Sequence, residues 1–189
     1  AGFKLYQLDI WFEEMLPESG ILDITEAQKQ VRGVLAHCPD AAVMFRLHVN
    51  PPFWWLKQHP EECCRFADDP LQPEPHRPFH QNYLWQDLNT VPRCSYASTK
   101  WQRWMEGQVA DFCRQLAVTE EGKHVMGIQI ANGLNGEHHQ WGFVKHDPDV
   151  SEPMRMYFQE FLKAKYKNDK ALRKAWNQKD ASLVKVSVP

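Results

Sequence analysis

The sequence predicts an α/β domain built on parallel strands. Three segments alternate apolar and polar side chains with the period of two that is typical of strands. Amphipathic helical segments lie between these strands and after the last of them. Strands that alternate with helices along a chain form parallel sheets through right-handed crossover connections. At 189 residues the chain is long enough to bury a hydrophobic core.

The predicted strands cover residues 3–12, 41–49 and 125–132. In the second strand the alternation separates an apolar face from a partly charged one. The apolar face carries Val43, Phe45, Leu47 and Val49, and the other carries Met44, Arg46 and His48. The pattern therefore predicts that Arg46 and His48 point to the same side of the sheet.

The first two predicted helices have recognisable start signals. Asp23 is suited to cap a helix over residues 23–37. Thr99 and Gln102 stand at capping-box spacing at the start of the second helix. Behind them an apolar stripe at helical spacing is formed by Trp101, Trp104, Met105, Val109, Phe112, Cys113 and Leu116. The stripe predicts that Cys113 is a small core residue.

Two further helices are predicted near the C-terminus. Ser151 is suited to cap the first of them, and Pro153 falls in its first turn, where proline is tolerated. Its apolar stripe is Met154, Tyr157, Phe158, Phe161 and Leu162. The last predicted helix covers residues 170–176.

Three parallel strands alone leave the edges of the sheet unpaired. Either more chain or a second copy, as a homo-oligomer, completes the fold, or residues 181–188 form a further strand. We treat residues 1–189 as a single incomplete domain. Its proline-rich segment at about 50–97 is longer than an ordinary connection, and long loops of this kind are usually functional.

Composition argues against several classes of partner. Lys and Arg number 22 against 24 Asp and Glu, and the net charge of −2 gives no field that favours nucleic acid. No apolar stretch reaches the roughly 18 residues of a membrane span, so no membrane partner is expected. The five cysteines include no CxxC pair, and free thiols or packing residues account for them as well as disulfides do.

A more specific signal comes from four segments in a fixed order. They are Arg46 followed by Asn50-Pro51-Pro52-Phe53-Trp54-Trp55, then Ser95-Tyr96-Ala97-Ser98, then Gly127 to Glu137, then Phe161 to Tyr166 with Leu172 to Trp176. In this order they resemble the clan A glycoside hydrolases, and most closely the family-42-like β-galactosidase group. The resemblance touches nearly the whole chain.

The resemblance implies a partial (β/α)8 TIM barrel. The three predicted strands would be roughly strands two to four of that barrel, with their helices. Glu137 would follow strand four, where this clan places its general acid/base. Clan A usually has Asn directly before this Glu, whereas here Gly136 intervenes and Asn135 stands one position further back. The nucleophile belongs at the end of strand seven, and no segment here corresponds to that strand.

Around Glu137 the resemblance and the residue chemistry indicate a carbohydrate site. Amides, a guanidinium, imidazoles and tryptophan faces suit sugar hydroxyls and sugar rings. The candidate substrate contacts are Arg46, His48, Trp54, Trp55, Asn132, Asn135, His138 and Trp141. Plainer roles compete with each of them: a solvated loop carboxylate for Glu137, an ion pair for Arg46, a core position for His48 and turn formation for the two asparagines.

The histidines and aspartates near position 140 are candidate metal ligands. His138, His139, His146, Asp147 and Asp149 are the residues in question. Adjacent histidines on a strand point to opposite faces, and no HExxH motif occurs. The sequence therefore favours neither a metal site nor a cofactor. A metal-dependent hydrolase is kept as a third functional hypothesis.

The leading functional hypothesis is a retaining β-glycosidase acting on β-galactosides or related sugars. Such enzymes place two carboxyl groups about 5–5.5 Å apart, one as nucleophile and one as acid/base. Because the chain contains only one identifiable member of that pair, it is not expected to be a complete enzyme. The alternative is a non-catalytic carbohydrate-binding or interaction protein built on a truncated barrel.

Overall fold

A computed structural model describes residues 2–67, 93–133, 136–138, 147 and 149–189. The chain divides into two compact units. Unit 1 comprises Ala1–Trp55 and Trp101–His139, and unit 2 comprises Leu56–Lys100 and Gln140–Pro189. Most of the predicted loop at about 50–97 lies outside the described residues. The single domain over residues 1–189 stays a prediction.

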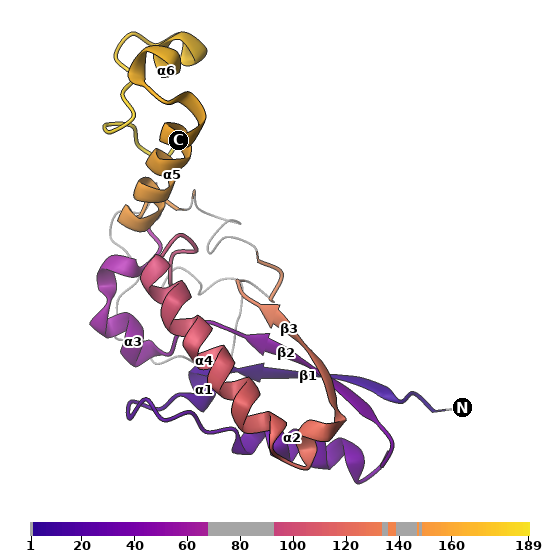
Figure 1. Ribbon diagram of the computed structural model, residues 1–189. Helices are drawn as coiled ribbons and strands as arrows, with labels where there is room; N and C mark the ends of the chain where they lie inside the picture. The colour runs from indigo at the N-terminus through magenta and orange to yellow at the C-terminus, as the bar shows by residue number, and fades with distance from the viewer. Residues whose placement is uncertain (1, 68–92, 134–135, 139–146, 148) are drawn as a thin grey trace. The chain divides into compact units, whose positions relative to one another are not determined.

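Unit 1 is built on a parallel sheet of three strands, in the order β1-β2-β3 (Figure 1). The strands are β1 (Leu5–Trp11), β2 (Ala42–His48) and β3 (Val125–Ala131). All three predicted strands are confirmed, with bounds up to two residues shorter at either end. The α/β class and the partial barrel with parallel strands are confirmed with them.

Helices connect these strands. The short α1 (Phe12–Met15) follows β1, and α2 (Thr25–Leu35) leads to β2. After β2, α3 (Phe53–Gln58) and α4 (Thr99–Ala117) each cross the boundary between the units along the chain. The 3-10 turn η2 (Glu121–His124) then leads into β3.

The start of α2 shows how local chemistry fixes a helix boundary. The Asp23 side chain accepts a hydrogen bond from the Thr25 amide at 2.9 Å, which satisfies one of the free donors of the first turn. The helix begins at Thr25, two residues later than predicted. Ala27 and Val31, one turn apart, are its buried residues.

Three phenylalanines form the centre of the hydrophobic core of unit 1. Phe12, Phe45 and Phe112 are fully buried. The Phe112 ring packs edge-on against Phe12 at 6.1 Å between centroids and against Phe45 at 5.9 Å. Helix α4 is thus fixed to the apolar face of the sheet, which the alternation in β2 predicted.

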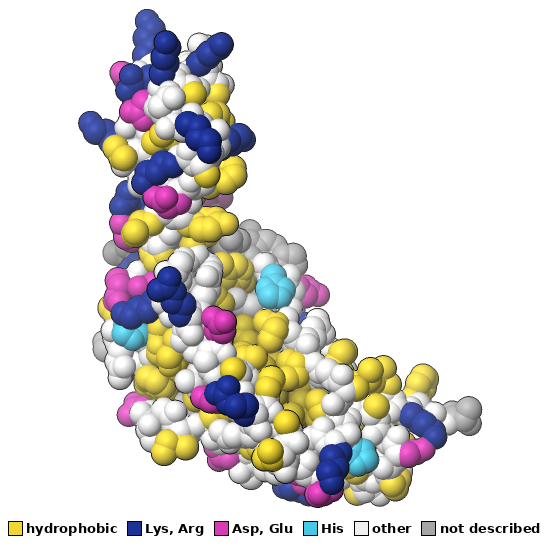
Figure 2. Space-filling model, viewed as in Figure 1, with side chains coloured by type: hydrophobic (Ala, Val, Ile, Leu, Met, Phe, Trp, Pro, Cys, Tyr) yellow, Lys and Arg dark blue, Asp and Glu magenta, His cyan; other side chains and the backbone are white. Residues whose placement is uncertain are grey.

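Cys113 is exposed, so its prediction as a core residue is wrong. One step along a helix turns a side chain by about 100°, which carries Cys113 away from the buried Phe112. It lines an open apolar groove together with Leu116, Val125 and Met126. Figure 2 shows hydrophobic side chains gathered between α4 and β3.

Unit 2 contains the 3-10 turn η1 (Pro60–Glu62) and two helices, α5 (Glu152–Tyr166) and α6 (Asp169–Trp176). The Ser151 side chain accepts a hydrogen bond from the Met154 amide at 3.4 Å, so the predicted cap of α5 is confirmed. Asn168 caps α6 in the same way through the Ala171 amide.

The small core of unit 2 explains why residues 181–188 are not a strand. Leu183 packs with Leu162 of α5 and Leu172 of α6. The segment turns here, because the Lys185 and Val186 amides both donate to the Ser182 carbonyl at 3.1 Å. The Val184 and Val186 carbonyls accept hydrogen bonds from a helix side chain. The segment forms no strand, so the prediction of a fourth strand is wrong.

That helix side chain is Gln159, which is buried in α5. Its amide donates to the Val184 and Val186 carbonyls at 3.1 and 3.2 Å. In the predicted apolar stripe, by contrast, Tyr157 and Phe161 are 63% and 51% exposed. The stripe is therefore only partly covered within the described residues.

A buried carboxylate joins three segments of unit 2. Asp149 accepts hydrogen bonds from the Arg65 amide at 3.0 Å, the Ser151 amide at 2.9 Å and the Ser95 hydroxyl at 2.5 Å. Asp149 is 3% exposed, and these three donors offset the cost of burying its charge. Its contacts hold Arg65 and Ser95, two residues of the segment at about 50–97, next to the start of α5.

Candidate functional site

The sheet of unit 1 has a polar face opposite its phenylalanine core. In the parallel register Asp9 of β1 pairs with Arg46 of β2, and Arg46 pairs with Gln129 of β3. The Gln7 amide also donates to the Gln129 side chain at 2.6 Å. Because side chains alternate along a strand, these polar groups share one face.

Asp9 organises this face. Its Oδ1 lies 3.2 Å from His48 Nε2 and 3.7 Å from Arg46 Nε. A carboxylate only accepts hydrogen bonds, so the Nε2 of His48 carries the proton and donates it. The imidazole also stacks on Trp11, with ring centroids 4.8 Å apart and an interplanar angle of 14°. In a neutral ring, Nδ1 of His48 then acts as an acceptor.

Burial lowers the pKa of His48 below its usual 6.5, and it outweighs the opposing effect of the Asp9 carboxylate. The unfolded chain therefore takes up a proton at a higher pH than the folded chain does. We expect the free energy of unfolding to fall as the pH drops from about 6.5 toward the lowered pKa. Denaturant titrations of the wild type and of His48→Asn across this window check this, and the loss should be smaller in the variant. Equal losses in both proteins would contradict it.

A tight turn follows β3 and carries Glu137. Gly133, Gly136 and His138 all have positive φ, at 73°, 71° and 58°. The Gly136 amide donates to the Gly133 carbonyl at 3.3 Å, and the His138 amide donates to the Asn132 carbonyl at 2.8 Å. Glu137 is exposed in this turn, at the carboxyl end of the strand.

Gly136 is required by its neighbours as well as by its φ. A Cβ at this position would lie 2.8 Å from the Ala131 Cβ and 2.9 Å from the Arg46 guanidinium. Arg46 therefore reaches from β2 to the turn that carries Glu137. This close approach gives a physical reason for glycine where the resembled enzymes have asparagine.

We expect Gly136→Ala to displace the turn and with it Glu137. Real Cβ atoms essentially never approach another atom within 3.0 Å, so the backbone must shift. Misplacing a reacting group by about 1 Å can cost about 10²-fold in rate. If Glu137 has the acid/base role that the sequence resemblance implies, turnover of a β-galactoside by the complete gene product measures this loss, with Gly107→Ala, on open helix surface, as the control. Wild-type turnover in Gly136→Ala would contradict it.

The predicted tryptophan contacts are engaged in packing. Trp55 is 3% exposed and stacks on Trp104, with centroids 5.4 Å apart. Trp54 lies edge-on to Trp104 at 5.9 Å and donates its indole N–H to the Leu16 carbonyl at 2.9 Å. Of the two predicted contacts, Trp54 is half-buried and Trp55 is buried.

The remaining predicted contacts lie close to the turn or outside the described residues. Asn132 is 6% exposed, and its side-chain oxygen accepts from the Gly133 amide at 2.8 Å, so it forms part of the turn. His138 is exposed, with Nε2 3.3 Å from the Ile130 carbonyl. Asn135 and Trp141 lie outside the described residues.

Sequence reasoning missed Asp9 and Trp11. Both stand on the polar side of β1, two and four residues beyond Gln7, and the register brings them beside Arg46 and His48. The period of two identified this face in β2, and the same alternation in β1 was the signal that could have found Asp9.

Among the described residues no group of three or more His, Cys, Asp or Glu is arranged to hold a metal ion. His139 and His146 of the sequence-based metal reading fall outside those residues. Across the described ranges, no helix has both the length and the apolarity needed to cross a bilayer.

Comparison with solved structures defines the class of fold. The chain matches part of several β-galactosidases, and it has the architecture of a partial (β/α)8 barrel like theirs. It spans about a quarter of the length of the β-galactosidases it matches first. No protein-family model and no curated protein matches the sequence.

Three of the matched structures illustrate the similarity. The β-galactosidase of Bacillus circulans sp. alkalophilus is 12% identical, with a TM-score of 0.64, over 98% of this chain and 24% of that one. That of the Antarctic haloarchaeon Halorubrum lacusprofundi is 18% identical, also with a TM-score of 0.64, over 100% and 25%. The cold-adapted enzyme of Rahnella sp. R3 is 18% identical, with a TM-score of 0.59, over 98% and 24%.

Proposed function

We propose that this chain is the acid/base-bearing part of a retaining β-glycosidase, and that Glu137 is its general acid/base. One observation carries the proposal. Glu137 stands in a tight turn directly after the third parallel strand of a partial barrel, and Arg46 of the neighbouring strand packs against that turn. In barrel enzymes the carboxyl ends of the strands bear the catalytic residues.

The chemistry assigned to Glu137 has two steps. It first protonates the glycosidic oxygen as the leaving group departs, and it then removes a proton from the water that releases the sugar. By the family resemblance, we expect the nucleophile that acts with it on the seventh strand of the barrel, to which none of β1, β2 and β3 corresponds.

The polar face of the sheet supplies the supporting charges. Arg46 is fixed between Asp9 and the turn, where its positive charge is suited to orient a carboxylate of the site. His48 presents Nδ1 as an acceptor for a sugar hydroxyl, since Nε2 donates to Asp9. Trp11, which is half-buried and stacks on His48, is the tryptophan of this face suited to contact a sugar ring.

The substrate class we propose is β-galactosides. This rests on the β-galactosidase structures that the chain matches and on the ordered motifs of its sequence. No described contact distinguishes the axial hydroxyl of galactose from the equatorial one of glucose, so the test must compare sugars directly.

The experiment is a panel of aryl β-glycosides incubated with the complete gene product. We expect release of the aryl group, fastest from the galactoside. Calorimetry on the same sample separates the alternatives if no hydrolysis is found. Binding of oligosaccharides without turnover would replace the proposal with a carbohydrate-binding function, and neither binding nor turnover would remove both.

A further inference from the structure

Two cysteines of unit 2 face each other across an isolated antiparallel bridge. Cys63 and Cys94 are directly opposite partners. The flanking backbone hydrogen bonds run from Cys64 N to Arg93 O and from Ser95 N to Glu62 O, each at 2.8 Å. Bonds on the flanking residues make Cys63 and Cys94 a non-hydrogen-bonded pair. Such pairs have Cα atoms about 4.5 Å apart, which lies within the range that disulfides span.

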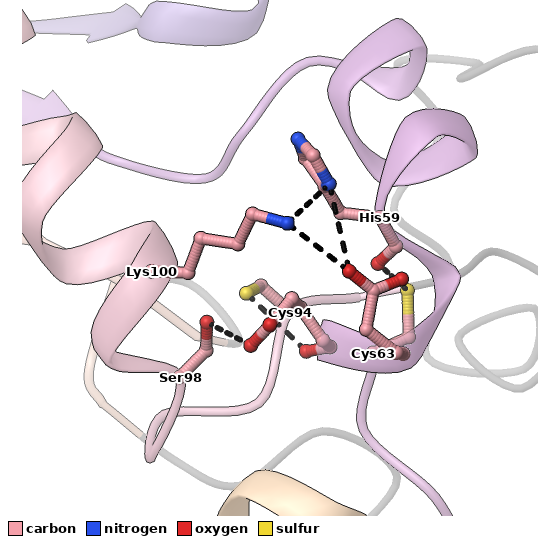
Figure 3. Close-up of polar contacts among 7 residues, drawn as sticks. His59, Cys63, Cys94, Ser98 and Lys100 are labelled. Atoms are coloured by element: carbon pink, nitrogen blue, oxygen red, sulfur yellow. Dashed lines mark hydrogen bonds and ion pairs between the residues drawn. The ribbon is translucent and has the colours of Figure 1, made fainter.

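Both thiols are free, and each sulfur lies near a backbone carbonyl (Figure 3). The Cys63 sulfur lies 3.9 Å from the His59 carbonyl, and the Cys94 sulfur lies 3.5 Å from the Glu62 carbonyl. S–H to carbonyl contacts of this kind are second-order interactions. Rotation about the Cα–Cβ bonds would break them at little cost.

Contacts between other side chains also tie the two segments together. The Ser98 hydroxyl donates to the Glu62 carboxylate at 2.6 Å, which ties the start of α4 to η1 (Figure 3). Lys100 Nζ lies 2.9 Å from His59 Nδ1 and 3.2 Å from Glu61 Oε1. These contacts hold the two backbone segments in register while the thiols change.

We propose that Cys63 and Cys94 are a modification site, at which two thiols are oxidised to an intramolecular disulfide. The oxidant class is a small disulfide such as oxidised glutathione. One cysteine loses its proton and attacks the oxidant, forming a mixed disulfide and releasing one glutathione thiolate. The second cysteine loses its proton and attacks the protein sulfur of that mixed disulfide, releasing the second glutathione. The two protein thiols lose two electrons, the oxidant gains them, and the two released protons end on the two glutathione thiols.

Burial of the two thiols sets the pH dependence of these steps. It raises the pKa of Cys63 to about 11 and raises the pKa of Cys94 well above its ordinary value. The thiolate is the attacking species, so the reaction is expected to quicken as the pH rises. Cys64 does not compete, because neighbouring side chains on an extended segment point to opposite sides.

Closing this bridge would join residues 63 and 94 across a long stretch of chain. A cross-link over a loop of this length removes many conformations from the unfolded state. We expect the melting temperature to rise by about 5–10 °C. The inference rests on the backbone register in unit 2 and is independent of the proposed glycosidase activity.

The test treats the folded full chain with oxidised glutathione at about pH 9 and maps a non-reduced digest by mass spectrometry. We expect one peptide pair joined through Cys63 and Cys94, a higher melting temperature and reversal of both by dithiothreitol. Cys113→Ser, which removes an exposed thiol, should leave the cross-link intact. Cys94→Ser should abolish it and trap glutathione on Cys63.

Three results would overturn the proposal. The first is glutathione attached to Cys113 while Cys63 and Cys94 stay reduced. The second is a disulfide that uses Cys64, and the third is a disulfide found only between separate chains. Circular dichroism of Cys94→Ser before oxidation shows whether the variant is folded. If it is not, the wild-type peptide map alone decides, because it needs no substitution.

Discussion

Replacing Glu137 by Gln should lower kcat on an alkyl β-galactoside by about 10³-fold in the complete gene product. General acid/base catalysis typically contributes about 10²–10⁴-fold, and an alkoxide leaving group needs its proton. Gln has nearly the same shape as Glu but holds no transferable proton. Because Glu137 is exposed in its turn, the substitution should leave the melting temperature nearly unchanged.

Glu106→Gln is the matched control for this prediction. Glu106 is an exposed carboxylate on α4, and its replacement removes the same charge outside the proposed site. We expect wild-type kcat in this variant. The experiment compares initial rates and melting temperatures of the wild type and the two variants. Wild-type turnover by Glu137→Gln would end the assignment of Glu137.

Replacing Phe112 by Ala should lower the free energy of unfolding by about 3–5 kcal/mol. The Phe112 ring is fully buried and contacts both Phe12 and Phe45, so its removal leaves a cavity that the sheet and α4 cannot fill. The loss combines the transfer of the ring to water, the cavity and two edge-on aromatic contacts.

Val118→Ala is the control for this second prediction, because Val118 is 86% exposed just beyond α4. We expect a change within about 0.5 kcal/mol. Guanidinium titrations of the wild type and the two variants, fitted with one common m-value, measure both changes in the free energy of unfolding. A loss below about 1 kcal/mol in Phe112→Ala would show that these three rings are not the centre of the core.

Alternation with period two was sufficient to locate the strands of unit 1. In β2 one face is buried and the other is less so, and Val43, Phe45 and Arg46 lie on the predicted faces. The start of α5 was equally readable, since the Ser151 cap is a local interaction. Such features depend on residues only a few positions apart.

Features that depend on distant partners could not be read in this way. The link between Asp9 and His48 joins two strands 39 positions apart, and the tight fit of Gly136 depends on Arg46 in another strand. Val184 and Val186 have strand-like alternation, but Gln159 of α5 binds their carbonyls. Periodicity carries no information about such partners.

The acid role of Glu137 is tested most directly by the acidity of the leaving group. The measurement is kcat/KM of Glu137→Gln relative to wild type on a dinitrophenyl β-galactoside and on an alkyl β-galactoside. Dinitrophenolate can leave without being protonated, whereas an alkyl leaving group needs a proton from the general acid. The value of kcat/KM reports the step in which the leaving group departs. We predict a ratio near one on the first substrate and a loss of about 10³-fold on the second. Equal losses on both would contradict the assignment of Glu137 as the general acid.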